Sequence, residues 1–197
     1  MLPAAFASGW ASGINAWGTV LVLGILGRFA NVPDIPAGFQ RTDVLIAMGA
    51  LCLIEVVADK IPYLDSAWDT VSTVVRPIAG AVIGAVYAGS SGDLVTLALA
   101  SVGGLTALAS HLTKAGLRLA INTSPEPFTN VAASSAGDVA VTGIATLAAL
   151  APVAAAIIAA VLLILGAIGV AVALRKVKKG WARFQAWRKR AAAPTQT

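Results

Sequence analysis

The chain has 197 residues, of which 58% are hydrophobic and only 12% are charged. Soluble domains typically carry about 25% charged residues, so the composition argues against a soluble fold. Residues 1–174 hold six Lys/Arg and nine Asp/Glu (net −3), whereas residues 175–190 hold eight Lys/Arg and no acid (net +8). Because this basic segment adjoins the longest apolar run, its expected partner is the lipid bilayer with its anionic headgroups, and not nucleic acid.

The first expected membrane span covers residues 5–28, within a stretch where residues 1–27 carry no ionisable side chain. No basic residue precedes its apolar run, so we expect the segment to be retained and not cleaved as a signal peptide. The small and polar residues around Gly13 and Asn15 leave two interpretations open. The segment is either an ordinary helix or a broken, re-entrant one, whose non-helical backbone must be buried in protein or face water.

Several further runs are long and apolar enough to cross a hydrocarbon core of ~30 Å, which takes about 20 helical residues. Pro152 divides the uncharged residues 139–174 into two helices. The predicted fold is therefore an all-α polytopic transmembrane bundle over residues 1–174, with five spans as the alternative count. The six expected spans are 5–28, 43–60, 66–88, 93–119, 128–150 and 153–174.

The orientation follows from the rule that Lys and Arg near span ends stay on the cytoplasmic side. The basic segment places the C-terminus in the cytoplasm, and six spans then place the N-terminus there as well. We expect a multi-pass protein of the cell inner (cytoplasmic) membrane with both ends inside. Gly-x-x-x-Gly spacing at Gly9/Gly13 and Gly80/Gly84 predicts close helix packing.

Residues 175–190 are predicted to form a cytoplasmic basic amphipathic helix at the membrane surface, because aromatic residues recur at three-residue spacing among cations. The alternative is a disordered basic tail, and residues 191–197 are expected to be disordered. The predicted membrane-surface residues are Lys178, Trp181, Arg183, Phe184, Trp187 and Arg188.

Ionisable side chains inside membrane spans cost roughly 2.5–3.5 kcal/mol each on insertion scales, so they mark either partners or a transport path. Glu55 and Asp59 are four residues apart and stack on one helical face, and Asp65 and Asp69 repeat this spacing at the start of the next helix. Arg76 lies on the same face as Asp69, two turns deeper. It therefore needs a carboxylate or a water-filled space.

The fourth span carries the complementary charge. His111, Lys114, Arg118 and Asn122 fall within about 80° of arc at ~100° per residue, which makes a cationic stripe on one helical face. The stripe runs to the expected cytoplasmic end of the span.

The fifth span follows two prolines that flank Glu126, enforce an irregular turn and permit a helix to start near residue 127. Asn130, Ser134 and Asp138 then recur at four-residue spacing. They form a polar face that must look into the bundle.

Two interpretations of these polar groups remain open. Six of them (Glu55, Asp59, Arg76, Lys114, Asn130, Asp138) either line a cytoplasm-facing polar cavity for an ion or small polar solute, or pair with one another and only fix helix register. One His, one Cys and the lack of hydrolase or phosphate-binding motifs argue against a metal site and an enzyme, so no catalytic residue is assigned and any cofactor is unknown. The predicted ligand- or ion-binding residues are Asn15, Glu55, Asp59, Lys60, Asp65, Asp69, Arg76, Lys114, Arg118, Glu126, Asn130 and Asp138.

A family resemblance rests on a set of motifs: Ser12-Gly13-Ile14-Asn15, Glu55-Val-Val-Ala-Asp59-Lys60-Ile61-Pro62 with Asp65 and Asp69, Arg76-Pro77 with Gly80, and Ser124-Pro125-Glu126-Pro127 with Asn130, Ser134 and Asp138. In these motifs, which cover most of residues 8–150, the chain resembles a bacterial membrane family, domain of unknown function 4126 (DUF4126). The resemblance implies an integral membrane protein and supplies no activity.

Two hypotheses for function follow. The first is a small transporter or channel-like protein, acting as a homo-oligomer because so short a chain encloses little by itself. In it Glu55 and Asp59 carry a cation or proton, the buried cations are counter-charges or anion contacts, and Asn15 and Asn130 coordinate through their amides. The second is a non-catalytic accessory or scaffold subunit of a larger membrane complex.

Overall fold

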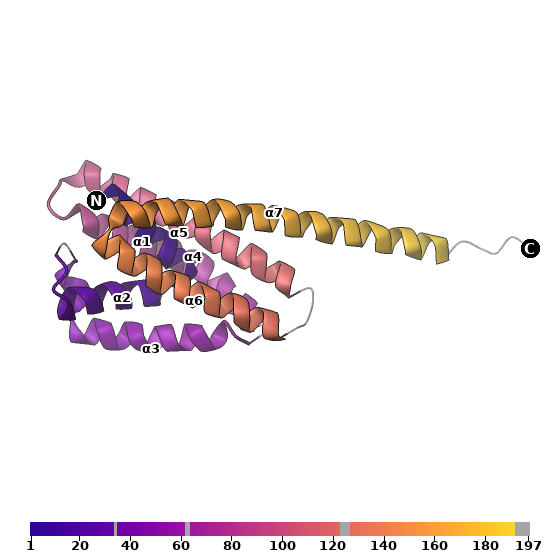
Figure 1. Ribbon diagram of the computed structural model, residues 1–197, viewed down its shortest axis with the longest axis horizontal. Helices are drawn as coiled ribbons and strands as arrows, with labels where there is room; N and C mark the ends of the chain where they lie inside the picture. Colours follow the sequence, from indigo (N-terminus) through magenta and orange to yellow (C-terminus); the bar gives the residue numbers. More distant parts are fainter. Residues whose placement is uncertain (34, 62–63, 123–126, 192–197) are drawn as a thin grey trace, which may run out of the picture.

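The computed structural model describes residues 1–33, 35–61, 64–122 and 127–191, without the side chains of residues 127, 186, 187 and 189–191. The described part of the chain is helical and contains no strand, which confirms the predicted all-α class. The elements are α1 (Leu2–Ile14), α2 (Ala16–Phe29), the 3-10 turn η1 (Ala37–Gln40), α3 (Thr42–Ala58), α4 (Leu64–Ala88), α5 (Asp93–Ile121), α6 (Pro127–Leu150) and α7 (Pro152–Ala191). They pack side by side in an elongated bundle from which α7 projects (Figure 1).

Four described helical stretches are long and apolar enough to cross a membrane: Leu64–Ala88, Asp93–Ile121, Phe128–Leu150 and Pro152–Gln185. The bundle is also apolar on the outside, where Leu94, Val139 and Leu105 are 81%, 73% and 67% exposed. Its interior holds charged side chains such as Arg76, which is 1% exposed. Burying charge and exposing large aliphatic side chains fits a multi-pass protein surrounded by lipid.

The first apolar segment folds as two short helices. α1 has 13 residues and α2 has 14, so each reaches only about 20 Å, less than a hydrocarbon core. They run in opposite directions, because Met1 and Ala4 at the start of α1 line one cavity with Pro33, Ile35 and Pro36, which follow α2. A single helix over 5–28 is therefore wrong, and the alternative of a broken, folded-back helix is confirmed.

Asn15 makes the reversal. Its backbone is extended (φ −151°, ψ 103°), and its side-chain oxygen accepts a hydrogen bond of 2.7 Å from the backbone N–H of Gly18. The Thr19 hydroxyl donates to the carbonyl of Asn15 at 2.8 Å. An Asn N-cap satisfies a backbone donor that no water reaches at this depth, because Asn15 is 3% exposed.

The fold-back decides where the N-terminus lies. Met1, Pro33, Ser91 and Pro152 line one cavity of about 720 Å³, so the N-terminus shares an end of the bundle with the three turns after α2, α4 and α6. α7 leaves that end and carries the C-terminal segment to the other one (Figure 1). Met1 and the C-terminal end of α7 thus lie toward opposite ends of the bundle, whereas the expected topology had both ends together.

Glycines allow three helices to approach closely. A Cβ on Gly9 of α1 would lie 2.5 Å from the carbonyl oxygen of Gly103 in α5, and one on Gly80 of α4 would lie 2.6 Å from the same oxygen and 2.6 Å from the Cβ of Ala107. Gly13 and Gly84 are equally close to α5. Both predicted Gly-x-x-x-Gly pairs therefore mediate helix contacts, and both of them face α5.

The C-terminal segment is not a separate element. α7 is one helix of 40 residues, about 60 Å long, so it runs through residue 174 without a break. A basic helix over 175–190 was predicted, and a helix is present there. Its side chains Lys178, Trp181, Arg183, Phe184 and Arg188 are exposed; the side chain of Trp187 and residues 192–197 lie outside the described part.

We expect Gly80→Ala to lower the melting temperature of the detergent-solubilised protein, because the new methyl group must push α4 away from α5. Overpacking of this kind costs about 1–3 kcal/mol. Gly49→Ala in α3 is the matched control, since a Cβ there meets nothing within 4 Å. A Gly80→Ala protein that melts at or above the wild-type temperature would contradict the packing described above.

Candidate functional site

Seven ionisable side chains gather in the interior between α3, α4 and α5, and we call them the charge cluster. Six of them are at most 6% exposed, and the side chain of Lys114 is 11% exposed. The cluster consists of Glu55, Asp59, Asp65, Asp69, Arg76, Lys114 and Arg118. All seven belong to the residues predicted from the sequence.

Arg76 is the deepest cation of the cluster. Its Nη2 donates to Glu55 Oε1 at 2.7 Å, and its Nη1 lies 3.4 Å from Asp69 Oδ1. Nη1 also donates to the backbone carbonyl of Gly13 in the last turn of α1, at 3.3 Å. The predicted need of Arg76 for a carboxylate is therefore met twice. Its Nε has no hydrogen-bond partner among the described residues.

Lys114 and Arg118 bind the remaining acids. Lys114 Nζ lies 2.5 Å from Asp59 Oδ2 and donates to the carbonyl of Ile14, the C-terminal residue of α1, at 2.8 Å. Arg118 donates to Asp59 at 3.1 Å and to Asp69 at 2.9 Å, and its Nε lies 3.4 Å from Asp65. The two cations thus tie α5 to α1, α3 and α4 at once.

His111 belongs to the same network, although it was not among the predicted site residues. Its Nδ1 lies 2.7 Å from Arg76 Nη1 and its Nε2 lies 2.9 Å from the Thr73 hydroxyl. A guanidinium is only a donor, so Nδ1 must accept, and the imidazole is neutral with its proton on Nε2. Helical spacing could have identified both residues. His111 lies three residues before Lys114, and Thr73 lies three residues before Arg76, so each shares a helical face with a cation of the cluster.

Asn122 was placed on the cationic stripe but was also missing from the predicted site. Its amide donates to both carboxylate oxygens of Asp65, at 3.3 and 3.2 Å, and to the Ser66 hydroxyl at 3.1 Å. Asp65 also accepts from the backbone N–H of Ser66 at 2.5 Å. Asp65 is therefore a carboxylate held mainly by neutral donors.

The cluster contains unequal charge. Four carboxylates (Glu55, Asp59, Asp65, Asp69) face three cations (Arg76, Lys114, Arg118), so full ionisation leaves a net charge of 3 − 4 = −1. An uncompensated charge in an interior of low dielectric is unfavourable, and the usual remedies are a bound proton or a counter-ion. The cluster therefore favours one extra positive charge.

The other predicted residues lie apart from this core. Lys60 of the turn after α3 pairs with Asp138 of α6 at 3.1 Å, and these side chains are 30% and 26% exposed. Asn130 donates weakly to the carbonyl of Asp59, at 3.5 Å, and the Asn15 oxygen is occupied by its helix cap. Glu126 lies outside the described residues.

A cavity of about 220 Å³ lies beside the cluster, between α1, α5, α6 and α7. Lys114, Arg118, Asn130 and Ser134 are among the residues that line it, but most of its wall is apolar. The predicted polar cavity is thus divided: Lys114 and Asn130 line it, whereas Glu55, Asp59, Arg76 and Asp138 do not. The acids turn to the cations instead of to open space, because ion pairing stabilises buried carboxylates better than an apolar wall.

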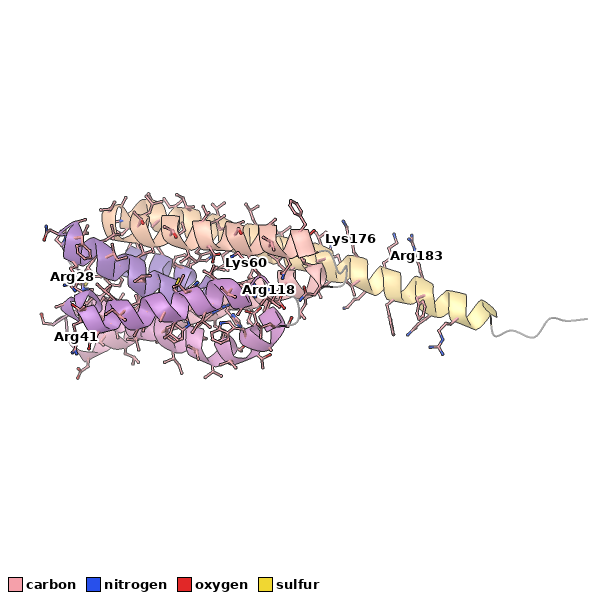
Figure 2. All side chains as sticks on the ribbon, turned by 90° about the horizontal axis from the view of Figure 1, so that it is seen from below. Arg28, Arg41, Lys60, Arg118, Lys176 and Arg183 are labelled. Carbon is pink, nitrogen blue, oxygen red and sulfur yellow. The ribbon has the colours of Figure 1, made fainter. Side chains whose placement is uncertain are left out.

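The labelled cations form two groups, one at each end of the bundle (Figure 2). Arg28 donates to Thr42 at 2.7 Å and Arg41 pairs with Asp43 at 2.6 Å, both on the surface. In that view Arg28 and Arg41 lie at one end of the bundle, and Lys60, Arg118, Lys176 and Arg183 lie toward or beyond the other.

The family described as domain of unknown function (DUF4126) matches residues 2–172. The chain belongs to this family. No match was found among curated proteins or among solved structures. The DUF4126 match covers α1 to α6 and most of the apolar part of α7, so it includes every member of the charge cluster and ends just before the basic segment.

We expect Arg76→Met to destabilise the protein strongly, because it leaves the buried Glu55 with Lys114, 3.9 Å away, in place of its close cation and leaves Gly13 without a donor. Breaking one partner of a buried ion pair costs about 3–5 kcal/mol. Arg76→Met combined with Glu55→Met should recover part of this loss, since the stranded charge is then absent. Arg41→Met removes an exposed pair and should leave the melting temperature unchanged; equal losses in the two single variants would refute the assignment.

Proposed function

We propose that this DUF4126 protein is a small transporter in the inner (cytoplasmic) membrane, with no catalytic step, and that the charge cluster carries a cation or proton in exchange with an ion or small polar solute. The observation that carries the proposal is the excess of one carboxylate over the cations in a buried cluster. Intramembrane ionisable groups of this kind mark ion paths by default. The assigned carriers are Glu55 and Asp59, as the sequence predicted.

The orientation is part of the proposal. Eight Lys/Arg in residues 175–190 place the end of the bundle that carries the projecting part of α7 in the cytoplasm. The end with Arg28 and Arg41, together with Met1, then faces outward. The bundle would have five crossings, α3 to α7, and the α1–α2 hairpin would enter and leave from the outside. The charge cluster lies in the cytoplasmic part.

The broken first helix supports a transport role. Secondary transporters commonly place half-helices at membrane depth, where their ends provide partial charges for substrates and coupling ions. Here α1 ends at Ile14, and its last carbonyls are bound by Arg76 and Lys114. Protonation of an acid that pairs with either cation would free that cation from its carboxylate. Charge uptake and the position of the helix end are thereby linked.

Access to the cluster is available from one side. The pair Lys60–Asp138 is partly exposed and lies where α3 and α6 approach, while the neighbouring cavity reaches Lys114 and Arg118. A solute that enters through the cavity would meet Lys114 and Arg118 first, and the acids of the charge cluster only after one ion pair opens. This arrangement favours an exchange mechanism over a continuous water-filled pore.

We expect purified protein in liposomes to move protons or a monovalent cation down an imposed gradient, measured with an entrapped pH dye across a panel of cations, anions and small metabolites. Glu55→Gln leaves three acids against three cations and should reduce the flux at least tenfold. Asp43→Asn, at an exposed pair near the other end of the bundle, is the matched control and should transport like wild type.

A second candidate function, an accessory or scaffold subunit of a larger complex, is favoured by one observation. Every cation of the cluster has a carboxylate within 3.4 Å, so the groups can serve as structural ion pairs. Absence of wild-type flux across the panel, with Glu55→Gln and Asp59→Asn only lowering the melting temperature, would support the scaffold. A homo-oligomer is compatible with both functions.

The basic part of α7 is proposed to bind anionic lipid headgroups. At ~100° per residue, Val177, Trp181 and Phe184 fall within about 60° of arc, and most cations of the segment lie opposite. The Trp181 and Phe184 rings are 5.8 Å apart and 62% and 47% exposed at the residue level. This exposed apolar stripe with a cationic back is typical of an interfacial helix.

For this segment we expect a spin label at Trp181→Cys to become inaccessible to a water-soluble relaxation agent when phosphatidylglycerol is added to phosphatidylcholine nanodiscs. A label at Arg183→Cys, on the cationic side, should stay accessible. Both variants would carry Cys52→Ser, so that only one thiol is labelled. Equal accessibility at the two positions in both lipids would contradict surface binding.

A further inference from the structure

The cavity beside the charge cluster has a polar end and an apolar end. Arg118, Ile121 and Asn130 lie toward the cytoplasmic ends of α5 and α6, whereas Trp10, Ala140 and Leu162 lie deeper in the bundle. Lys114 and Ser134 lie between these two levels. The cavity therefore changes from charged to apolar as it goes toward the membrane centre, as a lipid molecule does.

The ionisable groups that line this cavity are both cations. Lys114 and Arg118 line it, whereas their partners Asp59, Asp65 and Asp69 are not among its lining residues. A ligand in the cavity thus lies nearer to these two cations than to their acids, although the cluster as a whole has one acid in excess. The first turn of α6, which contains Asn130, adds the positive end of a helix dipole.

One buried hydroxyl in the wall is unused. Ser134 is 3% exposed and lines the cavity, yet its Oγ has no hydrogen-bond partner among the described residues. Buried hydroxyls are normally paired, so this one has no hydrogen bond to lose if it turns toward a ligand. Ser134 lies one turn after Asn130 on the same face of α6, so both can reach one headgroup.

The size of the cavity limits how large the apolar part of a ligand can be. At about 220 Å³ it exceeds an engineered cavity of ~150 Å³ that holds benzene, but it is smaller than most drug-sized sites. A single alkyl chain fits this space, and two acyl chains do not. We propose that the cavity binds a single-chain amphiphile with an anionic carboxylate or phosphate head, the head at Arg118, Asn130 and Ser134 and the chain toward Trp10 and Leu162.

This inference goes beyond the proposed transport function and can fail separately from it, because binding is measured without flux. The probe is a fatty carboxylate with a diazirine at the end of its chain, irradiated with the protein in phosphatidylcholine nanodiscs. Mass spectrometry should place the label on peptides that contain Trp10, Ala140 or Leu162. Decanoate or decyl phosphate should compete at concentrations at least tenfold lower than decanol or decyltrimethylammonium.

Two pairs of variants on α6 test the location. Gly137→Leu should abolish labelling by filling the cavity, because its Cβ meets only Ile14 at an ordinary 3.4 Å, whereas Gly143→Leu, with nothing within 4 Å, should label normally. Ser134→Ala should weaken competition by decanoate roughly 2–10-fold through one lost hydrogen bond, and Ser135→Ala should not. Melting temperatures of all four variants show that they are folded.

The outcomes are decisive in either direction. Tighter competition by decanoate than by decyl phosphate assigns a carboxylate head, and the reverse order assigns a phosphate. Equal competition by decanol, undiminished labelling of Gly137→Leu, or stronger displacement by a two-chain anionic phospholipid would each overturn the proposal. Labelling as expected in a protein without flux would overturn the transport function alone.

Discussion

A helix that stops in a buried interior leaves carbonyl groups with no water to bind, and this constraint organises the interior of the protein. α1 ends at Ile14, and the carbonyls of Gly13 and Ile14 accept from Arg76 and Lys114. The cations supply the missing donors, but each brings a charge that must itself be neutralised. The carboxylates of α3 and α4 do this. The charge cluster thus follows from the broken helix, and the broken helix depends on the cluster.

Close packing makes this mutual dependence possible. Arg76 can reach the end of α1 only because α1, α4 and α5 approach one another at Gly9, Gly80 and Gly103. The same approach buries Ser110, whose hydroxyl donates to the carbonyl of Trp10 at 2.8 Å. Small residues set the distances, and the long polar side chains then span them. Neither set of residues would be sufficient in the absence of the other.

Many of the contacts in this interior could be predicted, because a charged side chain in a membrane-spanning helix is costly and therefore needs a partner. The stacking of Glu55 on Asp59, the need of Arg76 for an acid and the stripe from His111 to Asn122 all follow from helical spacing and from the cost of a buried charge. The broken helix was one of two interpretations, because the small residues before Asn15 are compatible with either. The motifs that carry the family resemblance contain the same residues, and the family supplies no mechanism.

The missed features have a common cause. Residues 1–27 contain no charge, so their sequence does not indicate whether this segment continues as one helix or folds back on itself. The end of the bundle at which the N-terminus lies depends on that difference, and it could not be predicted either. One of the two interpretations placed a cavity among the acids, because polar residues in a span can face open space, and the other had the charged groups pair with one another. In the structure the acids and cations pair with one another. The cavity lies beside them and has a mostly apolar wall, which no pattern of polar residues in the sequence could predict.

The length of α7 has a mechanical consequence. A helix of 40 residues is about twice as long as a hydrocarbon core is thick, so it acts as a lever whose outer arm lies beyond the bundle. Its inner arm touches α5 through small residues, Gly166 against Thr113 and Gly169 against Leu117. Because the helix is continuous between the two arms, a force that tilts the outer arm is transmitted to the inner arm. The inner arm contacts α5 within one turn of Lys114 and borders the cavity, so the tilt would act there.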